Sequence, residues 1–452
     1  MYLRLEHRAV VILYILLFPV LCGFNPVWGQ QAQERVYAVS QTNGALLGAV
    51  SNPGNVVGGN IETNAALSVP VGALGLSSAY IQPRFSTLLS AGTTTYLKLG
   101  INSSLLGVGI SISVQAYNNG SAVGTQVTLG SLLSLLNGEY LDEMVFTPQD
   151  SNGNFVAYDA VRITLNGGIL SAGANMDVYY AYYLRDATTS IVCNTPEEVL
   201  YGSIGTLLSG VNQVENPLNS IDGDYNTYTH LRSNVGVADK TYIKSLYNTL
   251  SREGDSVRVV FQNPDGGLLD ASLLASSFTI RTYNDDTDNG ALALDENLLS
   301  LSLLPGSSDV QVLTYPVEVV FNRIEVAIGE GLLNALGSMY VYEMERVLKA
   351  PDVISPEMVD GIVYACFGDE VTLQIDQPVT DSTYNWYTEA SGGTPVFSGT
   401  SYTPDTTVAG THYFYVSETR TGCTDESGRA VAQVVVHPSY SHPDISIGNT
   451  TN

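Results

Sequence analysis

Residues Tyr158–Leu170 (YDAVRITLNGGIL) and Phe321–Leu333 (FNRIEVAIGEGLL) carry the same pattern of apolar and polar residues at an offset of 163 positions. The register continues downstream without a gap, so that Met176 aligns with Met339. Several matching blocks in one order indicate a duplicated structural unit rather than chance similarity. The two predicted copies are residues 35–187 (repeat 1) and 190–349 (repeat 2).

Each copy has the composition of β-strands. Ser256–Gln262 and Phe278–Tyr283 are rich in β-branched and aromatic residues. Arg323–Ile328 alternates polar with apolar residues, which is typical of a strand with one face in water. Turn-forming Asn-Gly pairs begin at Asn119, Asn152 and Asn289. Strands joined by turns in units of this length predict an all-β protein with tandem β-sandwiches of the jelly-roll type.

The composition excludes several classes of partner. The chain has 452 residues, of which 14% are charged, and 18 Lys and Arg stand against 44 Asp and Glu, for a net charge of −26. Nucleic acids and anionic membranes are bound by clustered cations, which this chain lacks. We therefore expect neither as a partner.

Residues 1–29 have the pattern of a signal peptide. Arg4 and Arg8 precede an apolar run at 9–21, which is shorter than the roughly 20 residues of a membrane-spanning helix and typical of a signal core. Small residues around Trp28 suit cleavage before Gln30. The expected mature protein is secreted or held at the cell surface, with no membrane span.

The C-terminal third has a different pattern. Val371, Leu373 and Ile375 alternate as in a strand with one buried face, and Trp386 lies between two cysteines. The motifs resemble those of Ig-like repeats in large secreted proteins of the Bacteroidetes group, and they cover nearly all of residues 360–437. They are Cys366–Leu373 (CFGDEVTL), Tyr384–Tyr387 (YNWY), Gly392–Pro395 (GGTP), Tyr402–Pro404 (YTP) and Gly422–Cys423 (GC).

This resemblance implies an immunoglobulin-like β-sandwich at residues 355–437, after the two repeats. It places Trp386 in the core and implies a disulfide between Cys366 and Cys423, which export would permit. Cys193 is then the odd cysteine of the mature chain, expected as a buried thiol. Residues 438–452 are either a disordered tail or the start of a truncated next domain.

An acidic turn opens repeat 2, at Asp222–Thr227 (DGDYNT). It resembles the opening motif of discoidin-like sandwiches (coagulation-factor type C) and of related carbohydrate-binding modules. In that family the turn and a glutamate near the last strand bind one calcium ion. The resemblance implies a calcium site in repeat 2, since calcium prefers oxygen ligands. The implied ligands are Asp222, Asp224, Thr227 and Glu343.

Two departures from the family pattern bear on this site. Tyr228 stands close to the position where the family often has tryptophan. Repeat 1 has Gly58, Asn60 and Tyr180 in place of the three acidic residues, so no ion is expected there. The alternative is an ordinary exposed turn, because Asp, Asn and Gly are common turn formers. A second acidic segment, Asn284–Gly290, is expected as a solvated hairpin tip.

The sequence contains no G-x-S-x-G, H-E-x-x-H, P-loop or S-x-x-K motif, and we predict no enzymatic activity. The predicted function is that of an exported cell-surface adhesin or binding protein. It would present its sandwiches to glycans or protein partners, with the Ig-like domain as a spacer. The 28 tyrosines offer rings that stack on sugars. The alternatives are a structural stalk or matrix component and the non-catalytic part of a truncated secreted enzyme.

Overall fold

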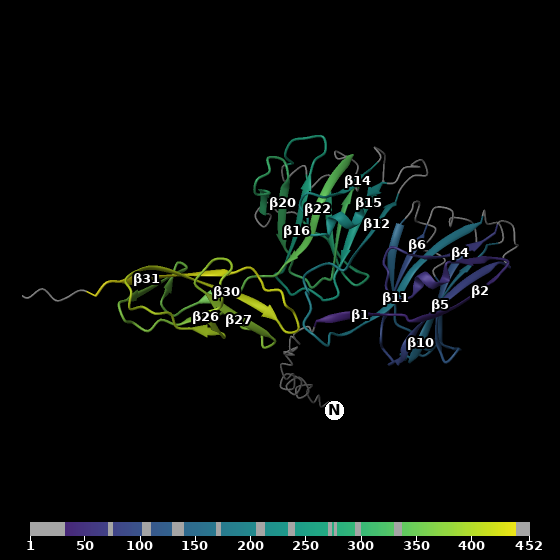
Figure 1. The fold of residues 1–452 in the computed structure, drawn as a ribbon, viewed down its shortest axis with the longest axis horizontal. Helices are drawn as coiled ribbons and strands as arrows, with labels where there is room; N and C mark the ends of the chain where they lie inside the picture. Colours follow the sequence, from purple (N-terminus) through teal and green to yellow (C-terminus); the bar gives the residue numbers. More distant parts are fainter. Residues whose placement is uncertain are drawn as a thin grey trace, which may run out of the picture.

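The computed structural model describes residues 32–439, except 71–75, 102–109, 129–139, 169–172, 205–212, 234–239, 270–273, 275–277, 294–299 and 330–336. The predicted all-β fold is confirmed, since the described residues form β-strands in five sheets. Figure 1 shows three units, with repeat 2 between the other two. The predicted signal peptide and residues 440–452 lie outside the described residues. In the described part of the chain, no helix is long and apolar enough to cross a membrane.

Repeat 1 is a sandwich of two sheets. One sheet has the order β2-β5-β10-β7-β8, and the other contains β9-β6-β11-β4-β3 with β1 added to β11. Side chains of both sheets meet in one apolar core, with Ile81, Leu97 and Ile163 fully buried. Its strands are β1 (Gln33–Tyr37), β2 (Ser40–Leu46), β3 (Ala49–Ser51), β4 (Ala65–Val69), β5 (Ser78–Leu89), β6 (Thr95–Ile101), β7 (Ser111–Asn118), β8 (Ser121–Thr128), β9 (Tyr140–Phe146), β10 (Tyr158–Asn166) and β11 (Ala174–Asp186), and the 3-10 turn η1 is Pro53–Val56.

Repeat 2 is a second sandwich around Val259, Phe261 and Phe321. Its outer sheet has the order β13-β14-β22-β16-β20-β19, and its other sheet contains β18-β17-β21-β15-β12. Its elements are β12 (Glu198–Ile204), β13 (Val214–Glu215), the 3-10 turn η4 (Pro217–Ser220), β14 (Thr229–Arg232), β15 (Lys240–Leu246), β16 (Ser256–Gln262), β17 (Phe278–Asn284), β18 (Thr287–Ala291), β19 (Ser300–Leu303), β20 (Gln311–Pro316), β21 (Arg323–Ile328) and β22 (Ser338–Val347).

The C-terminal unit is a smaller sandwich with sheets β23-β26-β29 and β24-β25-β31-β30-β27-β28. Trp386 is fully buried, and its indole N–H donates to the Gly399 carbonyl at 3.0 Å. Val371, Leu373 and Ile375 are buried around it, on the face expected from the alternation. The strands are β23 (Val353–Ile354), β24 (Met358–Val359), β25 (Ile362–Cys366), β26 (Leu373–Ile375), β27 (Ser382–Tyr387), β28 (Phe397–Ser398), β29 (Ser401–Tyr402), β30 (Gly410–Arg420) and β31 (Ala430–His437).

The two repeats share one continuous sheet. β12 of repeat 2 pairs with β9 of repeat 1 through Gly202 and Tyr140, which joins strands of both repeats into an eleven-stranded sheet. One pair of residues is too short a contact to fix two domains by backbone bonding alone. Side chains of the described residues add further contacts across the junction.

Glu198, the first residue of β12, lies at the centre of this junction. Its side chain is fully buried. It accepts a hydrogen bond from Arg35 Nη1 at 3.2 Å, and it is also bound by the Lys98 ammonium and the Tyr180 hydroxyl. Because all three partners belong to repeat 1, one carboxylate of repeat 2 neutralises two buried cations of its neighbour.

A second buried carboxylate also joins the repeats, but here repeat 1 supplies the carboxylate and repeat 2 supplies the cation. Glu143 of repeat 1 accepts hydrogen bonds from Arg323 of repeat 2 at 3.0 Å and from the Tyr182 hydroxyl at 2.9 Å. The Arg35 guanidinium lies 4.4 Å from the centre of the Tyr182 ring. Burial raises the pKa of Tyr182 well above its usual value, so that this hydroxyl stays protonated and donates to Glu143.

Replacing Glu198 by Gln should destabilise the junction strongly. The substitution leaves Arg35 and Lys98 buried without their carboxylate, and breaking a buried pair in this way costs about 3–5 kcal/mol. Glu34→Gln is the matched control, because Glu34 pairs with the half-exposed Arg185 and such pairs contribute at most about 1 kcal/mol. Urea unfolding followed by circular dichroism measures both, and equal shifts for the two variants would contradict this account.

Candidate functional site

The acidic turn of repeat 2 lies between η4 and β14. The Asp222 carboxylate accepts hydrogen bonds from the Asp224 N–H at 2.9 Å and from the Thr227 hydroxyl at 2.7 Å. Gly223 has a φ of 75°, in the left-handed region that favours glycine. These contacts close the loop around the Asp222 side chain.

Glu343 in β22 lies against this loop and is only 3% exposed. Its Oε1 atom is buried and accepts no hydrogen bond from the described residues. Burial raises the pKa of Glu343 to about 8. The negative charges of Glu345 and Asp222 also raise this pKa, whereas a hydrogen bond from the Gly223 N–H lowers it. A buried carboxylate oxygen without a donor is unfavourable, and a cation or a proton would satisfy it.

The predicted ligands are therefore only partly brought together. Asp222, Thr227 and Glu343 are neighbours, whereas the Asp224 carboxylate accepts hydrogen bonds from the N–H and side-chain amide of Asn226 at 3.0 and 2.6 Å. The same hydrogen bonds lower the pKa of Asp224. In this conformation, Asp224 offers the loop its backbone carbonyl, which accepts a hydrogen bond from the Thr227 hydroxyl at 3.1 Å.

The loop borders a cleft of about 360 Å³ between repeat 2 and the C-terminal unit. Four carboxylates line it, from Asp222, Glu343 and Glu345 of repeat 2 and from Glu426 of the C-terminal unit. Glu345 is held by Arg258 at 3.0 Å and by the Tyr225 hydroxyl at 2.7 Å. Carboxylates, hydroxyls and carbonyls are the oxygen ligands that calcium prefers. No three of these four carboxylates bring ligand oxygens within 4.8 Å of one another, so an ion here would take at most two of them, together with hydroxyl or carbonyl oxygens.

Repeat 1 holds no corresponding set. Gly58 and Asn60 stand in its turn, and Tyr180 occupies the position of Glu343. Tyr180 is fully buried and bound to Glu198 at the junction. The position that carries the buried carboxylate in repeat 2 serves domain packing in repeat 1.

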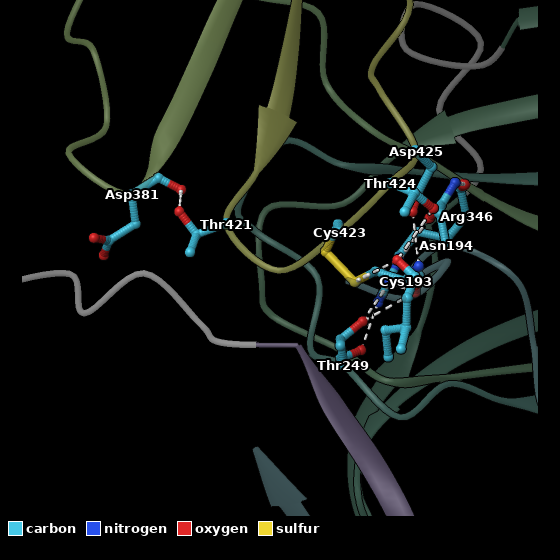
Figure 2. Close-up of a disulfide and its surroundings, with 10 residues drawn as sticks. Cys193, Asn194, Thr249, Arg346, Asp381, Thr421, Cys423, Thr424 and Asp425 are labelled. Carbon is cyan, nitrogen blue, oxygen red and sulfur yellow. Dashed lines mark hydrogen bonds between the residues drawn. A yellow bond between two sulfur atoms is a disulfide. The ribbon is translucent and has the colours of Figure 1, made fainter. Parts of the chain in front are cut away.

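The predicted disulfide between Cys366 and Cys423 is wrong. Cys423 instead forms a disulfide with Cys193, with their Cα atoms 5.4 Å apart, and Cys366 is a free, exposed thiol. Figure 2 shows this bridge in the loop after β30. It ties the junction of the two repeats to the C-terminal unit, across 230 positions of sequence.

Strand geometry explains the error. Cys366 pairs with His437, the last residue of β31, whereas Cys423 precedes Ala430, the first residue of β31. Eight strand residues span about 26 Å, and a disulfide needs Cα atoms less than about 7 Å apart. The two cysteines therefore lie at opposite ends of the sandwich.

Charged side chains surround the disulfide (Figure 2). Arg346, almost fully buried, donates to the Cys193 carbonyl at 2.7 Å and to the Thr249 carbonyl at 2.6 Å. Beyond the residues drawn there, Arg420 of the C-terminal unit binds both oxygens of the buried Asp255 of repeat 2, at 2.6 and 2.8 Å. The C-terminal unit is thus docked by a covalent bond and a buried ion pair together.

This cluster is not a metal site. Cys193, Cys423 and Asp425 are the one group of three Cys, His, Asp or Glu residues, among those described, whose ligand atoms lie within 4.8 Å of one another. Their two sulfur atoms are bonded to each other. The Asp425 carboxylate accepts the Cys193 N–H at 2.7 Å, which helps to hold the loop.

A Ser-His-Glu arrangement lies on the outer sheet of repeat 2, and the sequence motifs did not predict it. His230 Nε2 lies 2.6 Å from Ser338 Oγ, and its Nδ1 lies 3.5 Å from Glu215. The Glu215 carboxylate makes its short bond to Arg232, at 2.6 Å, so it orients the imidazole weakly. Burial and Arg232 lower the pKa of His230. These contacts hold a neutral ring on the sheet surface.

Residues 355–438 match the family model described as "Ig-like domain CHU_C associated". The C-terminal unit is an Ig-like domain, as the resemblance implied. A search of curated proteins finds no match to the chain.

Solved structures with similarity include carbohydrate-binding modules. The family 32 module of C. perfringens NanJ in complex with galactose matches with a TM-score of 0.21 and 16% identity, over 35% of this chain and 97% of that one. The mannan-recognising module TmCBM27 matches with a TM-score of 0.23 and 14% identity, over 34% and 96%. A β-1,2-glucanase from Parabacteroides distasonis matches with a TM-score of 0.22 and 17% identity, over 56% and 39%. At these TM-scores the matches assign no ligand site in this chain.

The disulfide between Cys193 and Cys423 predicts a simple peptide map. A non-reduced digest should contain one linked peptide pair with these two residues, while Cys366 should react with iodoacetamide in the native protein. Removing a bridge across a loop of this length should cost on the order of 5 kcal/mol in the chain-entropy model, so Cys423→Ser should lower the Tm. Cys366→Ser is the control and should leave it unchanged. A peptide linking Cys366 to Cys423 would refute this pairing.

Proposed function

We propose that this chain is an exported, non-catalytic binding protein of the cell surface. In this proposal its β-sandwich repeats are presented to glycans, and the Ig-like domain spaces and orients them. Calcium occupies the acidic turn of repeat 2. The expected signal peptide at residues 1–29 directs the protein out of the cytoplasm.

The disulfide between Cys193 and Cys423 is the observation that carries this proposal. Structural disulfides persist in oxidising compartments outside the cytoplasm, and this one joins separate sandwiches rather than the two sheets of one. Together with the ion pair between Asp255 and Arg420, it fixes the Ig-like domain on repeat 2. A fixed row of sandwiches suits a protein that displays binding surfaces at a set distance and angle.

The charged groups of the described residues also favour a non-catalytic role. The buried carboxylates Glu143, Glu198 and Asp255 all pair with arginine or lysine across domain junctions. These three carboxylates therefore have a structural role, and in this proposal the carboxylates that line the cleft beside Glu343 hold calcium. The arrangement of Ser338 with His230 lies on a sheet face, and its third member, Glu215, is bound to Arg232.

A glycan array probed with the full chain, in calcium and in EDTA, tests this function. We expect saturable binding to a restricted set of glycans, and no hydrolysis of p-nitrophenyl acetate that depends on Ser338. Absence of binding to any glycan would refute the proposal and favour a structural stalk. Ester hydrolysis that Ser338→Ala abolishes would refute the non-catalytic role.

The calcium site has its own test by thermal unfolding. Millimolar calcium should raise the Tm of the wild-type chain by several degrees at neutral pH, because a ligand bound only to the folded state stabilises it. Glu343→Gln should abolish this increment, since the amide keeps the shape of the side chain and loses the charge that binds the ion. Glu62→Gln, in the corresponding turn of repeat 1, is the matched control and should keep the increment. No calcium effect on the wild type would leave the acidic segment as an ordinary turn.

A further inference from the structure

The outer face of the six-stranded sheet of repeat 2 carries a row of aromatic rings. We call Tyr228, His230, Tyr340 and Tyr342 the tyrosine ledge. The rings of Tyr228 and Tyr340 are stacked with their centres 4.1 Å apart. The rings of His230 and Tyr340 are T-shaped, with their centres 4.8 Å apart. Tyr228, His230 and Tyr340 are half-buried, so part of each ring meets solvent.

The tyrosine ledge is held in place from below and from both sides. Tyr342 packs with Val260 and Val312 in a small apolar cluster beneath it. Its hydroxyl donates to the Gln262 side-chain oxygen at 2.6 Å. At the other end, His230 is held by Ser338 at 2.6 Å. Rings fixed in this way lose little conformational freedom when a ligand binds.

The charges beside the tyrosine ledge are one ion pair and two acidic side chains, Asp265 and Asp309. Arg232 binds Glu215 at 2.6 Å, and Asp309 accepts a hydrogen bond from Gln262 at 2.7 Å. Burial and Arg232 lower the pKa of His230, which favours the neutral imidazole. The ledge thus offers rings and polar groups without a cationic cluster, on a chain with a net charge of −26. Such a surface complements an uncharged ligand and repels a polyanion.

The internal repeat shows which residues of repeat 1 stand at the positions of β22. The alignment places β11 over β22, with Tyr179 and Tyr180 at the positions of Tyr342 and Glu343. In repeat 1, Tyr179 packs with Leu200 and Leu246 of repeat 2, and Tyr180 binds Glu198. The Ig-like domain docks around Cys193 and Asp255 and contributes none of the ring contacts of the ledge.

We propose that the tyrosine ledge binds a neutral polysaccharide, with the apolar face of a sugar ring on the part of the stacked Tyr228 and Tyr340 pair that meets solvent. Tyrosine combines a flat apolar face with a hydrogen-bonding hydroxyl, and a sugar ring presents the complementary pair, a face of C–H groups and a rim of hydroxyls. This inference rests on the proposed glycan-binding function and assigns it to one surface.

Affinity gel electrophoresis of the full chain tests the assignment. The probes are soluble neutral polysaccharides (a glucan, a galactomannan and a xylan), with polygalacturonate as the anionic comparison. We expect a neutral probe to retard the wild type and Tyr340→Ala to weaken that binding by about tenfold, the loss of one aromatic contact. Tyr364→Ala, at an exposed tyrosine of the Ig-like domain, is the matched control and should bind as the wild type does.

Each other outcome overturns the assignment in a distinguishable way. Binding of a neutral probe that survives both Tyr340→Ala and Tyr228→Ala leaves the proposed function standing and removes the ledge from it. Retardation by none of the neutral probes overturns the ledge, and the glycan array then decides the function separately. A dimer of the wild type that Tyr340→Ala dissolves, seen by sedimentation, would make the ledge a subunit interface instead.

Discussion

The arrangement of this protein depends on the buried carboxylate of Glu198. It comes from repeat 2, yet its cationic partners, Arg35 and Lys98, belong to repeat 1. Leaving a buried charge at this junction without its partner is strongly unfavourable. The reciprocal pair of Glu143 with Arg323 makes the dependence mutual. Burying charges of opposite sign on two surfaces specifies one relative orientation, because any other orientation leaves a charge unpaired.

The second junction follows the same logic and adds a covalent bond. Asp255 binds Arg420 of the Ig-like domain, while Cys193 bonds to Cys423. Since both junctions are specific, the cleft beside Glu343 and the tyrosine ledge keep fixed positions relative to the rest of the chain. In repeat 1, Tyr179 and Tyr180 contact repeat 2 at the first junction, whereas Tyr228 and Tyr340 of repeat 2 are half-buried.

The sequence predicted what depends on local pattern, namely the all-β class, the Ig-like domain and the position of Asn119-Gly120 between β7 and β8. It failed where distant segments meet. Asn289-Gly290 lies inside β18, and the hairpin turns at Asp285, which contacts Tyr96 of repeat 1 rather than only solvent. Cys193 lacked a partner within its own unit, which was the available signal for a bridge between units. The closeness of Asp222 and Glu343 was implied by the family resemblance alone, because local pattern does not predict that a turn and a last strand meet.

The claim that buried charge pairs and a disulfide hold three sandwiches in one arrangement is tested most directly by small-angle X-ray scattering of the full chain in low and in molar salt. Buried pairs are screened much less than exposed ones. The account predicts the same radius of gyration and the same maximum dimension in both solutions, matching the arrangement in Figure 1. An increase of either quantity in molar salt, or scattering that requires a mixture of shapes, would contradict it.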